Sequence, residues 1–468
     1  MMENFNYKKS LDEINSSISI ENKSNKFKKI ISFLGPAYLI GVGYIDPGNW
    51  ATDLASGSLF GYKLIWVLII SNIIALYMQH LSARIGIVKG MDLAQLSKYI
   101  YSYYINIILY VLAELSIIAT DLSEVIGMAI GLKLLFGIPI YIGIFITLFD
   151  TLLILIFFNK NVRLMELFII LMISITGISL FLQVFLSKPD IKEIILGIVP
   201  SKLNYDSLYI SIGIIGATVM PHNLYLHSSL VQTRIVIKDY KHIKEAIKYN
   251  LIDTTIALNI AFFINMSIMI LSASIFFKNN IYVDSIESAY YLINQLGYFA
   301  PILFAIALIA SGQSSTITGT LAGQIIMEGY LNIKIRPWIR RLITRSFAIL
   351  PSLFIIIYFG ENYINQLLIF SQVILSLQLG FAIIPLIYIN SSYDLMKKFT
   401  INKWQILMSY FLSSIIIFFN ISLIIMNIMT FNYNTKIYCF ILILMIFSIL
   451  FMVYILLYPF FKKIKPKQ

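Results

Sequence analysis

The sequence predicts an all-α protein that crosses a membrane many times, and three observations support this prediction. Of its 468 residues, 59% are hydrophobic and only 12% are charged, whereas soluble domains usually carry about 25% charged residues. The mean hydropathy is +0.83. Apolar stretches of the roughly 20 residues that a membrane helix needs recur along the chain. This composition excludes a soluble enzyme, and the single cysteine excludes a disulfide scaffold, a Cys-based zinc site and an iron–sulfur protein.

The apolar stretches predict about twelve membrane spans. They lie near residues 32–58, 64–83, 103–131, 138–158, 164–186, 207–233, 249–277, 299–327, 342–359, 363–390, 404–430 and 437–461. Residues 1–30 are polar and lack the apolar core of a signal peptide, so we expect a disordered cytoplasmic tail there.

The distribution of Lys and Arg predicts the orientation of these spans. Of 35 such residues, 28 lie in the two tails and in the loops on the same side of the membrane, and the opposite loops hold seven. Cytoplasmic loops carry an excess of positive residues. Both termini are therefore expected in the cytoplasm of a cell whose inner (plasma) membrane holds the chain. The net charge of +12 then reflects contact with the bilayer and not with nucleic acid.

Two predicted spans contain helix-breaking residues at their centres. The first span holds Pro47 and Gly48, and the sixth holds Pro221 and Asn223. Proline removes a backbone donor and disfavours helix before it, and unpaired backbone at membrane depth is tolerated only inside protein or beside a water-filled cavity. An ordinary proline kink would explain one such break. Two breaks that share the pattern Pro-x-Asn, at residues 47–49 and 221–223, favour a transporter.

Matched breaks in the first and sixth spans predict two inverted five-helix repeats with a substrate site at mid-membrane. The first repeat would cover residues 31–187 and the second residues 188–390. Residues 391–468 would add two helices and a cytoplasmic C-terminal tail.

The side chains at the breaks indicate a metal ion as the substrate. Asp46 offers a carboxylate and Asn49 an amide oxygen, ligands that suit many divalent cations. Met220 offers a soft thioether, which favours Mn²⁺, Fe²⁺ and softer transition metals over Ca²⁺ and Mg²⁺. Alternatively, Met220 fills space in the core.

Several motifs resemble the natural resistance-associated macrophage protein (NRAMP) family of proton-coupled divalent metal transporters, in particular its bacterial manganese transporters. They are DPGN at 46–49, ATDLSEV at 119–125, ATVMPHN at 217–223 continuing as LYLHSS, SGQSST at 311–316 and SQVILS at 371–376. The resemblance implies a LeuT-like fold, with two inverted five-helix repeats and additional C-terminal helices. It also implies proton-coupled import of Mn²⁺, with Fe²⁺ as a second cargo, by alternating access.

The resemblance further implies which residues hold the metal. Asp46, Asn49, Met220 and the carbonyl of Ala217 would be ligands, and Gln372 would join them in an occluded state. Gln378 competes for this last role, and Gly380 stands where the family commonly has proline. The metal would be cargo, so no resident cofactor, catalytic residue or obligate protein partner is expected.

Titratable residues inside the bundle suggest a proton route. His222 and His227 lie on the sixth span, and an imidazole exchanges protons near neutral pH. Asp121 and Glu124 share one face of the third span, so one of these two carboxyl groups is expected to hold a proton. Two arginines near the cytoplasmic ends of their spans, Arg234 and Arg345, would pair with these acids or ease proton exit. A buried structural ion-pair network is the alternative.

Two other functions remain open at this stage. A transporter of the same fold could carry Mg²⁺ or a sodium-coupled amino acid, although Asp46 and Met220 disfavour both cargoes. A non-transporting receptor or scaffold would have no need for acids inside the membrane.

Overall fold

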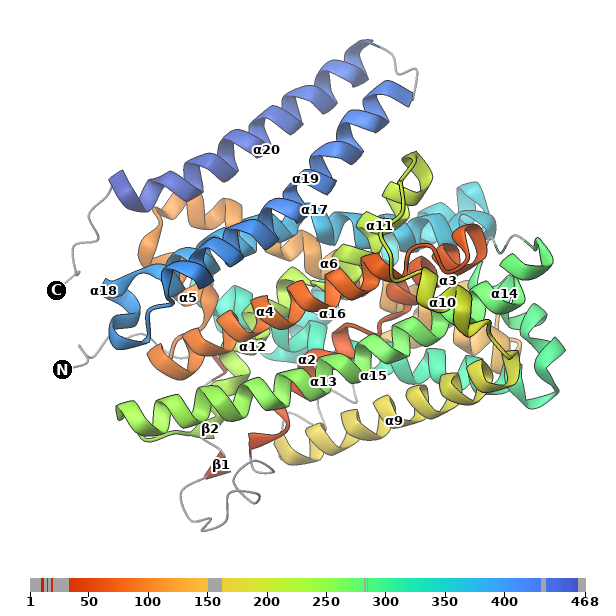
Figure 1. The fold of residues 1–468 in the computed structure, drawn as a ribbon, viewed down its shortest axis with the longest axis horizontal. Helices are drawn as coiled ribbons and strands as arrows, with labels where there is room; N and C mark the ends of the chain where they lie inside the picture. The colour runs from red at the N-terminus through yellow and green to blue at the C-terminus, as the bar shows by residue number, and fades with distance from the viewer. Residues whose placement is uncertain are drawn as a thin grey trace.

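The computed structural model describes residues 33–149, 162–281, 283, 285–430 and 435–461, together with residues 10, 11, 15, 18 and 19. Long helices lie alongside one another in an elongated bundle (Figure 1). The helices of the first half are α2 (Pro36–Gly43), α3 (Pro47–Phe60), α4 (Ile65–Lys89), α5 (Leu93–Ile100), α6 (Tyr103–Phe136), α7 (Ile140–Ile146), η1 (Thr147–Phe149) and α9 (Val162–Ser187). The later helices are α10 (Ile191–Leu196), α11 (Tyr205–Thr218), α12 (Pro221–Leu230), α13 (Tyr240–Ile275), α14 (Ile286–Ile293), α15 (Phe299–Leu331), α16 (Pro337–Phe359), α17 (Ile364–Ser391), α18 (Tyr393–Met396), α19 (Lys403–Thr430) and α20 (Thr435–Phe461).

A helix occupies part or all of every predicted span. Eight helices of the described residues are long and apolar enough to cross a membrane. The first and sixth spans are each divided into two shorter helices, and the second half of the fourth predicted span lies outside the described residues. The chain is therefore an all-α polytopic membrane protein.

Both predicted breaks are helix boundaries, and proline begins the second helix at each one. In the first span α2 ends at Gly43 and α3 begins at Pro47, while in the sixth α11 ends at Thr218 and α12 begins at Pro221. Proline suits the first helical position, because the N–H that it lacks would have no partner inside the helix.

The helices form two groups around the breaks. In one group, α13 packs against α2, α3 and α4; in the other, α6 packs against α15 and α16. The broken helix pair α11–α12 contacts α4, and α17 contacts members of both groups. Large apolar side chains on α9, α16 and α19 remain exposed, as expected for surfaces that face lipid.

Part of the N-terminal tail has defined contacts, which an entirely disordered tail would lack. Ile18–Ser19 forms strand β1, which pairs in parallel with β2 (Arg234–Ile235) just after α12. Leu11 is buried. The expectation of disorder therefore fails at these residues, because the helix ends supply a partner strand and an apolar site that composition does not reveal.

Candidate metal-binding site

The two helix breaks meet at the centre of the bundle, and a hydrogen bond joins them. The side-chain amide of Asn49, at the start of α3, donates to the carbonyl of Ala217 at 3.3 Å. Pro221 explains why this carbonyl is free, because in a continuous helix residue 221 would donate an N–H to it. The sequence thus creates an unpaired carbonyl, and the opposite break supplies a donor for it.

Asp46 caps α3 and lies at the centre of this region. One carboxylate oxygen accepts from the backbone N–H of Asn49 at 2.9 Å, and the other accepts from the hydroxyl of Ser123 on α6 at 2.8 Å. The side chain is fully buried. A carboxylate at a helix N-cap is stabilised by the free N–H groups and by the positive end of the helix dipole.

Several buried acceptor atoms at the breaks have no donor among the described residues. They are the amide oxygens of Asn49, Asn223 and Gln372. Leaving such an atom unpaired costs about 1–3 kcal/mol. A cation bound among these oxygens would compensate this cost.

Met220 lies at the second break, directly before α12. Its sulfur is 3.7 Å from the side-chain nitrogen of Asn223, which also donates to the carbonyl of Ile40 on α2 at 3.4 Å. Asn223 was identified from the sequence only as a helix-breaking residue. The structure shows that it connects Met220 to the first broken helix.

Gln372 reaches the same region from α17. Its amide nitrogen donates to the hydroxyl of Ser371 at 3.2 Å, and it packs so closely on Gly48 that a side chain at position 48 would collide with it. Neither amide atom of Gln378 has a partner in the described part of the chain. Helix α17 runs unbroken past Gly380, and Gln372 lies against Gly48, two residues from Asp46.

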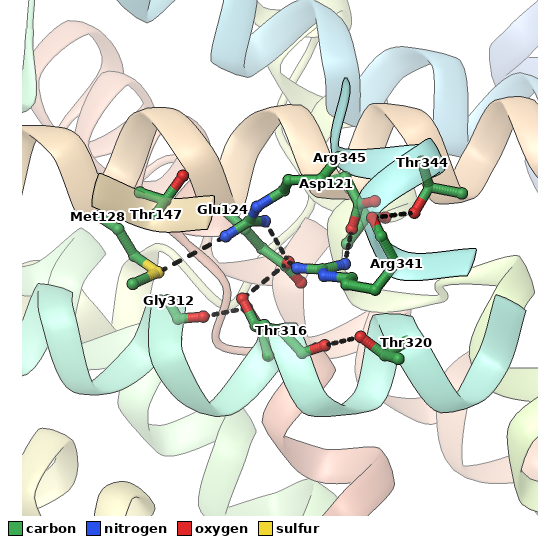
Figure 2. A network of polar contacts seen from close by, with 12 residues as sticks. Asp121, Glu124, Met128, Thr147, Gly312, Thr316, Thr320, Arg341, Thr344 and Arg345 are labelled. Atoms are coloured by element: carbon green, nitrogen blue, oxygen red, sulfur yellow. Dashed lines mark hydrogen bonds and ion pairs between the residues drawn. The ribbon is translucent and has the colours of Figure 1, made fainter. Parts of the chain in front are cut away.

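Asp121 and Glu124 lie in a charged network that is fully buried (Figure 2). Arg341 of α16 donates to both acids, with 2.9 Å between its guanidinium and Glu124. Arg345 donates to Glu124 at 3.2 Å, and Thr316 of α15 donates to the same oxygen at 3.0 Å. The two negative charges of these acids are matched by the two positive charges of Arg341 and Arg345. Their attraction offsets part of the free energy lost when the charged groups are removed from water.

Arg341 contacts both acids but was not predicted from the sequence, which had indicated Arg345. The spacing of four residues places Arg341 and Arg345 on one helix face, so the signal was present. Arg340 points to another partner and forms an ion pair with Glu114 at 2.6 Å.

Arg234 does not join this network, contrary to the sequence-based pairing. It forms a buried ion pair with Glu166 of α9 at 2.7 Å and donates to the carbonyl of Leu34 at 2.8 Å. The carboxylate of Asp253 on α13 accepts hydrogen bonds from the backbone N–H groups of Gly35 and Ala37 at the start of α2. These contacts secure the start of α2 and were not predicted, because the acids lie on helices distant in sequence.

The two histidines of α12 differ in their surroundings. Both ring nitrogens of the buried His222 lack a partner among the described residues. The ring of His227 instead contacts two amide side chains. Its Nδ1 is 2.9 Å from the side-chain oxygen of Gln79, and its Nε2 is 3.4 Å from the side-chain nitrogen of Asn250. With Gln79 accepting and Asn250 donating, His227 carries its proton on Nδ1 and is neutral.

Comparison with known proteins agrees with this geometry. A sequence profile described as "Natural resistance-associated macrophage protein-like" matches residues 37–426. The chain belongs to this family. It is 48% identical over 421 residues to the divalent metal cation transporter MntH of Listeria innocua, with 89% of this chain and 94% of the relative covered. It is also 48% identical over 414 residues to the natural resistance-associated macrophage protein 2 homolog of Dictyostelium discoideum, covering 88% of this chain and 66% of that protein.

Solved structures agree on the fold. A crystal structure of a mutant of the Eremococcus coleocola manganese transporter superposes with a TM-score of 0.89 at 32% identity, covering 97% of this chain and 99% of that one. Mhp1, a nucleobase-cation-symport-1 family transporter, superposes with a TM-score of 0.59 at 12% identity over 96% of this chain and 99% of its own. The NRAMP chain therefore has the LeuT-like fold that the family resemblance implied.

Proposed function

We propose that this NRAMP protein imports divalent transition metal ions, Mn²⁺ and also Fe²⁺, through the plasma membrane in symport with protons. The metal is the transported cargo, and no catalytic residue is assigned. The names of the relatives support this proposal, since the Listeria protein is a divalent metal cation transporter and the Eremococcus protein a manganese transporter. The observation that carries it is the meeting of Asp46, Asn49, Ala217 and Met220 at two helix breaks.

The cargo would bind between the breaks. Asp46 supplies the negative charge, Asn49 and Ala217 supply neutral oxygens, and Met220 supplies sulfur. Gln372, which packs on Gly48 beside these ligands, would complete the site when the outer side closes. Among the described residues no three His, Cys, Asp or Glu side chains cluster as a metal site. A site with a single carboxylate and neutral ligands suits transport, because the cargo must also leave.

Selectivity would come from Met220. Its thioether interacts well with Mn²⁺ and Fe²⁺ but gains little from Ca²⁺ or Mg²⁺, which prefer a full set of oxygen ligands. Desolvating these hard cations would then be poorly compensated.

The proton would leave Asp46 when the metal binds. Ser123, which donates to Asp46, lies directly before Glu124 on α6, and His222 lies nearby on α12. The proton would pass by way of these groups from Asp46 to Asp121 and Glu124, where Arg341 and Arg345 would neutralise the acids as they exchange the proton. His227 and Arg234 would serve this route indirectly, by fixing α12 and the start of α2 on the cytoplasmic side.

Metal uptake into proteoliposomes with an internal pH dye tests the proposal. We expect Mn²⁺ entry and internal acidification in the unmodified protein, and loss of both after Asp46→Ala. Glu193→Ala, in an exposed helix away from the breaks, is the matched control. Undiminished uptake by Asp46→Ala would refute the site. Mn²⁺ entry without acidification at an inward proton gradient would refute the coupling.

Competition in the same assay separates the other cargoes. Excess Fe²⁺ should reduce Mn²⁺ uptake, whereas Mg²⁺ and leucine should leave it unchanged. Inhibition by leucine would favour an amino-acid carrier of this fold, and equal inhibition by Mg²⁺ and Fe²⁺ would favour a hard-cation transporter.

A further inference from the structure

The two Pro-x-Asn sequences place an asparagine at the same position after each break, and each asparagine contacts the opposite break. Asn49 of α3 donates to the carbonyl of Ala217 in the last turn of α11. Asn223 of α12 donates to the carbonyl of Ile40 in the last turn of α2 at 3.4 Å. The proposed function uses Asn49 as a ligand of the cargo but gives no role to Asn223.

The break in the first span makes the Ile40 carbonyl available to Asn223. In a continuous helix the backbone N–H of Tyr44 would donate to this carbonyl. Tyr44 donates instead to the carbonyl of Gly41 at 3.1 Å, because the helix tightens where it ends. Gly43 leaves room for the incoming amide, since a Cβ at this position would collide with the side-chain nitrogen of Asn223.

The amide of Asn223 has a fixed orientation between α2 and Met220. Its nitrogen lies 3.4 Å from the carbonyl oxygen of Ile40 and 3.7 Å from the sulfur of Met220. Both partners are acceptors, so the nitrogen and not the oxygen of the amide must face them. All three residues are fully buried, and bulk water therefore does not compete for this N–H group.

A thioether ligand needs such a contact more than a carboxylate does. A methionine side chain has three rotatable bonds and adapts its shape easily. Its sulfur carries two lone pairs. A donor that occupies one lone pair holds the sulfur in place and leaves the other for a metal ion. Groups that orient a metal ligand commonly change the metal affinity by about 10–100-fold when they are removed.

We infer that Asn223 is a positioning residue that holds the sulfur of Met220 toward the cargo and so sets the preference for soft ions. This inference rests on the proposed function, in which Met220 is a ligand, and adds a residue that acts through that ligand. Because the same amide is bound to Ile40, the position of the sulfur also depends on α2. Affinity for soft ions would thus require contact between both broken helices.

Isothermal titration calorimetry on the purified full-length protein in detergent tests the inference without depending on transport. Cd²⁺ is a softer ion than Mn²⁺ and depends more on the sulfur. Asn223→Leu keeps a branched side chain of similar size but has no N–H group. We expect it to raise the Kd for Cd²⁺ about tenfold and the Kd for Mn²⁺ less than about threefold.

A double variant shows whether Asn223 acts through the sulfur. Met220→Ala should weaken Cd²⁺ binding more than Mn²⁺ binding, as Asn223→Leu does. Combining the two substitutions should weaken Cd²⁺ binding no further than Met220→Ala alone, because the asparagine then has no sulfur to position. Losses that add in the double variant would overturn the positioning role.

Asn265→Leu is the matched control. Asn265 is a buried asparagine of α13 whose side chain donates to the carbonyl of Tyr44 at 2.7 Å, so its loss also removes a donor to the first broken span. The ratio of the Kd values for Cd²⁺ and Mn²⁺ should stay unchanged. An equal change of this ratio in Asn265→Leu and Asn223→Leu would overturn the inference.

Thermal melting identifies the variants that fold. If Asn223→Leu does not fold, Gly43→Ala decides with the same expected change, because its methyl group would displace the amide.

The outcomes separate this inference from the proposed function. A ratio changed by Met220→Ala but not by Asn223→Leu would refute the positioning role alone. A ratio unchanged by Met220→Ala would refute Met220 as a ligand, and the positioning role with it. Selective loss of Cd²⁺ binding in Asn223→Leu, with no Mn²⁺ uptake by any of the proteins, would support the positioning role and refute the proposed function.

Discussion

Met220 shows how one side chain at a helix break can determine which ions are excluded. It stands directly before Pro221, its sulfur lies beside Asn223, and it is fully buried. A packing role and a ligand role make different predictions, because only a ligand affects the balance between soft and hard cations.

We expect Met220→Ala to retain most Mn²⁺ uptake and to lose discrimination against Ca²⁺. Oxygen ligands remain for Mn²⁺, while water can replace the sulfur and complete the shell of a hard ion. Inhibition of Mn²⁺ uptake should then need about tenfold less Ca²⁺, a difference of about 1.4 kcal/mol. Met78→Ala, at a buried methionine of α4, controls for lost packing. Unchanged Ca²⁺ inhibition would make Met220 a packing residue.

Arg341 should matter more to stability than Arg345. Among the contacts of the described residues, Arg341 bonds both Asp121 and Glu124, whereas Arg345 bonds Glu124 at 3.2 Å and the sulfur of Met128. Breaking a buried pair from one side costs about 3–5 kcal/mol, because a charge is left uncompensated. Arg341→Gln should therefore lower the melting temperature in detergent more than Arg345→Gln.

The double variant Arg341→Gln with Asp121→Asn tests the reason for this loss. Removing one charge of each sign restores the balance, so part of the lost melting temperature should return. Equal losses in the two single variants, or no recovery in the double one, would contradict the charge argument.

At the scale of single residues, the sequence predicts which residues form the site better than it predicts which side chains contact one another. Asp46, Asn49 and Met220 could be chosen because each sits at a recognisable break. Arg341 and Arg345 could not be separated, because the rotation of α16 about its axis depends on packing against α6 and α15. One of the two roles expected of Arg234, pairing with Asp121 and Glu124, was wrong because its partner Glu166 lies 68 positions away on another helix.

At the scale of helices, proline determines where the binding groups are exposed. Pro221 has no N–H to give to the carbonyl of Ala217, so that oxygen is available to Asn49 and to the cargo. Pro47 starts α3 in the same way, which leaves Asp46 as the cap of its first turn. Each break thus provides both an interruption and a ligand.

Pro221→Ala should weaken metal binding by restoring the missing donor. The new N–H can extend α11 into α12 and occupy the Ala217 carbonyl. The Ala217 carbonyl would contribute about 1–2 kcal/mol to the binding free energy of Mn²⁺. Its loss as a ligand predicts an increase of roughly tenfold in the KM for Mn²⁺. Pro351→Ala, at an exposed proline inside α16, is the matched control. A KM that stays the same in both variants would show that the free carbonyl does not serve the cargo.

Helix positions were largely predictable, because each span must contain enough apolar residues to cross the bilayer. The contacts of Leu11 and β1 were not predictable in this way. A polar segment gives no hydropathy signal, and its order depends on Glu328 and β2, which come from distant parts of the chain.

At the scale of the whole molecule, charge and hydropathy give complementary information. The apolar stretches predict the helices, and the few charged residues predict the orientation of these helices in the membrane. The buried arginines Arg234, Arg340, Arg341 and Arg345 are each paired with an acid, whereas the remaining Lys and Arg concentrate in alternate loops. The net charge of +12 thus reports topology, because the loops assigned to one side hold 28 of the 35 positive residues.

Reporter fusions test this orientation. Green fluorescent protein joined to either terminus should fluoresce, and alkaline phosphatase joined at the same points should be inactive, because both ends are expected in the cytoplasm. Phosphatase inserted between α13 and α14, beside Lys278, should be active, since this loop belongs to the opposite side with few positive residues. Active phosphatase at the termini would reverse the topology. The face where α2 begins and α12 ends would then lie outside the cell, and the direction of metal transport would have to be reassigned.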